Sequence, residues 1–106
     1  MVILANAFSL QMLDLTQQTN IKITPITVDD VKRLLATGFI SAIGHVDTAN
    51  VLTDLLEINV PMNRVNVSLT KDTVLVVAQL VGGRLPEGVT KLPAGFNFSF
   101  VKVELI

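Results

Sequence analysis

The chain of 106 residues contains no cysteine, no tryptophan and no tyrosine. Without cysteine there can be no disulfide framework and no metal site built on thiolates. Without tryptophan and tyrosine, a broad surface for stacking nucleic-acid bases is not expected. The single histidine and the scattered carboxylates show no recognisable metal-ligand spacing. We therefore predict neither a metal site nor a cofactor.

An excess of basic charge is also missing. Eight Lys and Arg residues stand against nine Asp and Glu, which gives a formal net charge of -1 and an isoelectric point near 5.6. A protein that grips many phosphates usually has a basic surplus, so duplex DNA or RNA is not an expected partner. A short anionic ligand is compatible with this charge.

Long hydrophobic runs are absent as well. The longest obvious one, Val74 to Ala78, is far shorter than the roughly 18 residues that a membrane span requires. The start of the chain has no basic region of the kind found in signal peptides and reaches a polar residue, Asn6, too early. We expect a soluble protein in the cytoplasm that binds no membrane, with its first residues inside the fold.

The composition that remains is rich in apolar residues. Half of the residues are hydrophobic and 16% are charged, and the length suits one small domain over residues 1–106. Such a small domain leaves much of its surface outside any core, so this apolar surplus favours a homodimer. A well-packed monomer is the alternative.

Hydrophobic periodicity outlines an α/β fold. Alternation and apolar runs predict strands at residues 2–8, 20–26, 64–70, 73–81 and 96–105, and helical spacing predicts helices over 27–37 and from about 44–46 onward. Pro25 marks an edge strand, residues 73–81 suit a central strand, and Thr27 with Asp30 resembles a capping box. The order β, β, α, α, β, β, β predicts a mixed sheet of about five strands with flanking helices.

The only histidine, His45, lies at the expected start of the second helix, where free backbone N–H groups favour an anion. Gly44 before it allows a ligand to approach the backbone closely. A histidine in this place could donate a proton to an oxygen that leaves phosphorus. The alternative is a histidine that only caps the helix.

Other polar residues give weaker signals. Arg84 and Glu87 lie in a loop after the strongest strand, where they could bind a phosphate and a sugar hydroxyl or could form a surface ion pair. Asn6 and Ser9 end a buried strand, where turn capping is the ordinary role. Arg64 opens an expected strand, as a phosphate contact or as a solvated side chain.

Taken together, the segments Asn6-Ala7-Phe8-Ser9, Ser41-Ala42-Ile43-Gly44-His45, Asn63-Arg64 and Arg84-Leu85-Pro86-Glu87-Gly88 resemble the viral ring nucleases that act as type III anti-CRISPR proteins. The resemblance covers nearly the whole chain. It implies a small homodimeric α/β protein that binds cyclic tetra-adenylate, the messenger of type III CRISPR defence, and cleaves it without a metal ion.

The resemblance also implies roles for individual residues. It makes His45 the general acid, with Arg84 and Glu87 positioning the scissile phosphate and the attacking ribose. Asn6 and Ser9 would contact the ligand, and Asn63 with Arg64 matches a further signature of the family. The chain departs from its relatives at Val89–Gly95, seven residues with Pro93 where a longer, often helical segment is usual. A protein that binds the ring without cutting it, or a structural module of a mobile element, remains an alternative.

Overall fold

Five strands form one mixed sheet in the order β2-β5-β4-β1-β3. The computed structural model describes all residues, 1–106. The strands are β1 (Val2–Ala5), β2 (Ile21–Pro25), β3 (Ile40–Ala42), β4 (Val74–Val81) and β5 (Asn97–Leu105). Two α-helices, α1 (Val28–Leu35) and α2 (Val46–Leu56), and a 3-10 turn, η1 (Leu10–Met12), complete the fold. The expected α/β fold with a mixed sheet is confirmed.

The first strand organises one half of the sheet. β1 pairs in parallel with β3 on one side and with β4 on the other. β5 is antiparallel to β4 and carries β2 on its outer edge. The sequence therefore located the central strand β4 and the edge strand β2 correctly, with Pro25 at an edge where its missing N–H does least harm.

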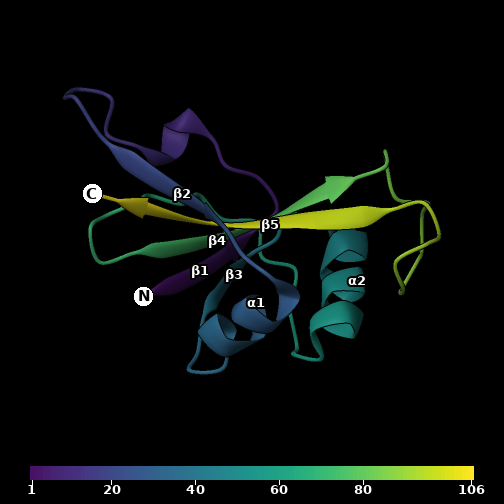
Figure 1. Ribbon diagram of the computed structural model, residues 1–106. Helices are drawn as coiled ribbons and strands as arrows, with labels where there is room; N and C mark the ends of the chain where they lie inside the picture. The colour runs from purple at the N-terminus through teal and green to yellow at the C-terminus, as the bar shows by residue number, and fades with distance from the viewer.

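Each face of the sheet has its own apolar core. Both helices cover one face, where Leu4, Val76 and Phe100 pack beneath Val31 and Leu52. Figure 1 shows the two helices on the same side of the sheet and η1 on the opposite side. That opposite face has no helix, and irregular segments cover it instead with side chains that include Phe8, Met12, Val67 and Leu69. At eight and eleven residues, neither α-helix is long enough to cross a bilayer.

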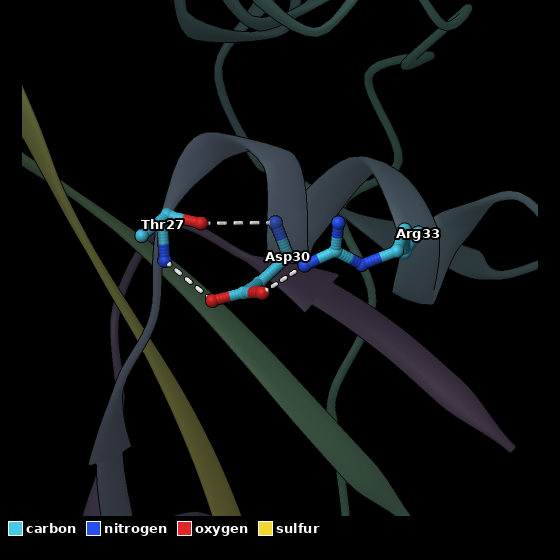
Figure 2. Close-up of polar contacts among 3 residues, drawn as sticks. All are labelled: Thr27, Asp30 and Arg33. Carbon is cyan, nitrogen blue, oxygen red and sulfur yellow. Dashed lines mark hydrogen bonds and ion pairs between the residues drawn. The ribbon is translucent and has the colours of Figure 1, made fainter.

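A capping box begins α1, as the sequence predicts. The Thr27 hydroxyl accepts a hydrogen bond from the Asp30 backbone N–H over 3.1 Å, and the Asp30 carboxylate accepts one from the Thr27 N–H over 3.0 Å. Figure 2 shows this pair together with Arg33, which binds the same carboxylate. Two N–H groups that the helix cannot satisfy internally thus find partners.

Two predictions about the middle of the chain are wrong. Residues 64–70 form no strand, although their alternation is real, because Val67 and Leu69 pack against the sheet while the backbone crosses its face with a single hydrogen bond to another segment, from the Leu69 N–H to the Met12 carbonyl. Conversely, Ile40–Ala42 is a strand that the sequence did not predict. Three residues carry too little local pattern, and this strand exists because β1 pairs with it. The observed order is β, β, α, β, α, β, β.

Replacing Thr27 with alanine should lower the free energy of unfolding by about 1 kcal/mol, the usual cost of losing an N-cap oxygen. Thr27→Ser keeps that oxygen and is the matched control. Urea unfolding followed by circular dichroism measures both variants. A Thr27→Ala transition that coincides with the wild-type one would contradict the capping box.

The same contacts predict a pH dependence. The hydrogen bond from the Thr27 backbone, followed by that of the Thr27 side chain, holds the pKa of Asp30 below its ordinary value of 3.8. A depressed folded pKa means that the stabilisation is complete above the unfolded pKa and disappears as the pH falls through the folded one. The difference between the wild type and Asp30→Asn, which has no titrating group at this position, should therefore shrink below about pH 4.

Candidate functional site

A cavity of about 440 Å³ opens beyond the carboxyl end of β1. Its lining comes from four places in the fold. Asn6 and Ala7 follow β1, Ala78, Gln79 and Leu80 belong to β4, His45, Asp47 and Thr48 form the start of α2, and Gly83, Arg84 and Leu85 follow β4. The volume lies in the range of about 300–1,000 Å³ that is typical of small-molecule sites.

The topology explains why the cavity lies here. β1 and β4 run in parallel, so their carboxyl ends reach the same edge of the sheet. Ligands of α/β proteins commonly bind in the crevice outside such strand ends. The N-terminus of α2 opens at the same place, and its free N–H groups and dipole favour an anion.

His45 is the N-cap residue of α2. Its backbone is extended, with φ of -129° and ψ of 131°, and its carbonyl accepts the first helical hydrogen bond from Ala49 over 3.0 Å. His45 thus holds the cap position that the alternative gives it, but its side chain makes no capping hydrogen bond. The ring is exposed and lines the cavity. It is therefore available to a ligand.

Arg84 and Glu87 do not behave as a pair. The three ion pairs in the chain lie elsewhere, so the surface pair that the sequence left open does not form. Arg84 lines the cavity with an exposed side chain. Glu87 is exposed in the same loop but is not among the lining residues. The structure thus brings Arg84 to His45 and leaves Glu87 outside the cavity.

Asn6 lines the cavity and contacts Gly44, which like Arg64 is not among the lining residues. The Gly44 backbone N–H donates to the Asn6 side-chain oxygen over 3.5 Å, which is a long contact. A Cβ atom built on Gly44 would lie 3.8 Å from Nε of Arg64, so the Arg64 side chain lies beside this glycine. Asn6, Gly44, His45 and Arg64, which are remote in sequence, therefore converge near the start of α2.

Ser9 lies apart from this group. Its hydroxyl accepts a hydrogen bond from the Gln11 N–H over 3.2 Å and caps η1, which is the ordinary role that the sequence allowed. It lines a second groove, of about 390 Å³, together with Gln11, Met12 and residues 65–68. Its position in this chain therefore gives it no contact with a ligand in the main cavity.

Two lining residues were missed from the sequence. Gln79 is exposed and is the only polar residue in β4, so a polar interruption of the most apolar strand was the available signal. Asp47 lies in the first turn of α2, and its carboxylate accepts a hydrogen bond from the Gly88 N–H over 3.3 Å. This contact joins the helix that carries His45 to the loop that carries Arg84.

The loop between β4 and β5 has no helix. Leu85, Val89 and Leu92 pack against the core on the helix side, which holds the loop down on the fold. Gly82 and Gly83 begin it with φ of 118° and 115°, values that side chains rarely adopt. A Cβ atom at Gly82 would lie 2.6 Å from the carbonyl oxygen of Gly95, whereas one at Gly83 would meet nothing within 4 Å.

Comparison with known proteins finds viral relatives. The model of the family described as STIV B116-like matches residues 2–96. Over 64 residues the chain is 38% identical to "Uncharacterized protein 26" of Sulfolobus islandicus filamentous virus (isolate Iceland/Hveragerdi), a match that covers 59% of this chain and 53% of the relative. The chain thus spans about half the length of that curated relative.

A solved structure matches almost throughout. B116 of Sulfolobus turreted icosahedral virus superposes with a TM-score of 0.78 at 28% sequence identity, over 97% of this chain and 97% of that chain. The shared fold includes both the strand ends and the start of α2 that form the cavity.

The two glycines predict a difference in stability. Gly83→Ala should cost about 1–3 kcal/mol for its strained backbone alone. Gly82→Ala has the same backbone cost and also meets the Gly95 carbonyl, so it should be less stable than Gly83→Ala by about 1 kcal/mol or more. Thermal unfolding of both variants measures this. Equal midpoints would show that the contact between the two ends of the loop is not tight.

Proposed function

The chain belongs to the STIV B116-like family, which includes proteins of archaeal viruses, and on this premise we propose that it is a ring nuclease that binds and cleaves cyclic tetra-adenylate without a metal ion. The observation that carries the proposal is the cavity itself. It combines an unbonded imidazole, a helix N-terminus and the Arg84 guanidinium at one strand end. These groups match a phosphodiester that is held, oriented and supplied with a proton.

The reaction is an in-line attack of a ribose 2′-hydroxyl on its own 3′-phosphate. The leaving 5′-oxygen takes a proton from His45, and the products are linear adenylates with a 5′-hydroxyl and a 2′,3′-cyclic phosphate. Since the nucleophile belongs to the substrate, the protein needs only to position groups, to stabilise charge and to donate the proton to the leaving oxygen, while the attacking 2′-hydroxyl releases its own proton to solvent. Two such cuts on opposite sides of the ring would give di-adenylates.

The individual side chains divide this work. Backbone N–H groups at the start of α2 and the Arg84 guanidinium bind the scissile phosphate. Asn6, Gly44 and Arg64 contact the neighbouring part of the ligand. Glu87 lies outside the cavity. It would orient the attacking ribose where the cyclic tetra-adenylate ring extends beyond the cavity. Ser9 caps η1 here, so we assign it no contact with the ring.

The partner that this function needs is a second copy of the chain. A two-fold axis lets both protomers present the same groups to opposite phosphates of a ring of four identical nucleotides. An unpaired segment, residues 64–68, supports the dimer because none of its backbone groups is hydrogen bonded within the chain. Such a segment is a template for pairing with another chain. The exposed Met62 and Val65 lie beside and within it, at 52% and 48% exposure.

By destroying the messenger, the protein would switch off type III CRISPR signalling in the cytoplasm of an infected host cell. Incubation with cyclic tetra-adenylate in the presence of a chelator, followed by mass analysis of the products, tests this. Di-adenylates with a cyclic phosphate support the proposal. Binding without cleavage would indicate a protein that only sequesters the ring, and a lack of affinity would favour an interaction module.

His45→Ala should lower the rate of ring cleavage by about 10²–10⁴-fold, the usual contribution of a positioned general acid. Ring binding should persist, because the helix N-terminus and Arg84 remain. A substrate with sulfur as the leaving atom needs little protonation and should recover much of the lost rate. Asn50→Ala, exposed on α2 and outside the cavity, is the matched control. Rapid cleavage by His45→Ala, or no selective rescue by sulfur, would refute the general acid.

Light scattering should return a mass of about 23 kDa, twice the chain mass of 11.5 kDa. Val65→Asp places a charge in the unpaired segment and should shift the mass toward that of the monomer. Leu15→Asp, at a residue that is 65% exposed but outside the segment, should remain dimeric. A wild-type monomer at micromolar concentration would refute the shared site, and a dimeric Val65→Asp variant would place the interface elsewhere.

A further inference from the structure

Two segments that are remote in sequence are tied together just before the start of α2. The Ser41 hydroxyl donates to the Pro61 carbonyl over 2.6 Å, and the Asn63 side-chain amide donates to the Ser41 carbonyl over 2.6 Å. The Asn63 backbone N–H donates to the Ile43 carbonyl over 2.8 Å. We call this set of contacts the 41–63 clamp. Ser41 is buried, with 5% of its surface exposed.

The clamp lies immediately before two residues of the candidate site. His45 follows Ile43 after a single glycine, so the place where the Ile43 carbonyl is held sets where α2 begins. Arg64 follows Asn63 directly, and its Nε lies beside Gly44. After Arg64, the backbone of residues 64–68 has no hydrogen bond within the chain. The clamp is therefore the last hydrogen-bonded point that fixes Arg64 relative to His45.

We propose that Asn63 and Ser41 are positioning residues, which set the distance between the Arg64 guanidinium and the start of α2 and thereby shape the anion site. The inference rests on the proposed function and extends it to residues that touch no ligand. The Ser41 hydroxyl and the Asn63 side-chain amide nitrogen each donate to a backbone carbonyl of the opposite segment. A misplacement of about 1 Å at a reacting centre can cost about 10²-fold in rate, so small shifts of the clamp suffice.

Asn63→Asp is the informative variant because it changes one donor and almost no volume. A carboxylate cannot donate to the Ser41 carbonyl and faces its lone pairs, whereas the protonated acid has an O–H group that can donate. The ratio of the Asn63→Asp rate to the wild-type rate should therefore rise as the pH falls toward the ordinary Asp pKa, about 3.9. Asn63→Ala has no titrating group, and its ratio should stay flat.

Cleavage rates and thermal unfolding together distinguish a positioning role from a role in the stability of the fold. At neutral pH, single-turnover cleavage of cyclic tetra-adenylate by Asn63→Asp and Asn63→Ala should fall by about 10–10²-fold while thermal unfolding stays close to wild type. In an Arg64→Ala background the same substitutions should have a clearly smaller effect, because residues that act through one another are not additive. Wild-type rates in the Asn63 variants, or full additivity with Arg64→Ala, would overturn the proposal while ring cleavage by the wild type stands.

A second measurement does not depend on the ring. Amide hydrogen exchange at Ile43 and at position 63 should be faster in Asn63→Asp than in wild type by about fivefold or more at neutral pH, because both amides lie in the clamp. If the wild type neither binds nor cleaves the ring, the proposed function fails, and this exchange still tests the clamp. Unchanged exchange would overturn the clamp whatever the ring assay gives.

Discussion

The parallel pairing of β1 with both β3 and β4 is the constraint on which the rest of the molecule depends. It brings the carboxyl end of β1 beside residues 78–80 of β4, which line the same cavity. It also directs the chain from β3 into α2 within a few residues, so that the helix starts at the edge of the sheet rather than beneath its middle. The cavity is therefore a consequence of this arrangement of strand ends and of the start of α2.

The unequal covering of the two faces follows from the same topology. Both crossover helices pack on one face, and the other is left to η1 and to the chain between α2 and β4. A helix would satisfy its own backbone, but residues 64–68 cannot. The face without an α-helix therefore carries this stretch of unbonded backbone, and the exposed Val65 lies within it. The proposed dimer contact at residues 64–68 directly follows the 41–63 clamp in the chain.

Much of the fold could be predicted because its signals are local. The Thr27 and Asp30 box, the apolar run of β4 and the proline in β2 each act through neighbouring residues or through burial on both faces. β3 could not be predicted, since a three-residue strand has no pattern of its own and depends on its pairing with β1. Residues 64–70 misled for the opposite reason, because alternate burial on a face looks the same in sequence whether or not the backbone is paired.

The residues of the candidate site likewise divide into those that could be predicted from the sequence and those that could not. Asn6, His45 and Arg84 end or follow regular elements, so their convergence follows once the strands are placed. Ser9 was separated from them by the short turn that it caps, and a sequence cannot show which way a turn directs the chain. Gln79 was missed because the strand around it was read for its apolar character alone.

The electrostatics of the cavity are set by one acidic group among basic ones. Asp47 stabilises the first turn of α2, where a carboxylate is favoured by the helix dipole, yet a phosphate would seek the same N–H groups. Its hydrogen bond with the Gly88 N–H directs that carboxylate toward the loop, away from a direct role as a cap. The carboxylate therefore serves as a tie between the His45 and Arg84 sides of the cavity. The helix N-terminus and the Arg84 guanidinium remain as anion-binding groups there, and local groups of this kind would let a chain with a net charge of -1 bind the proposed phosphate.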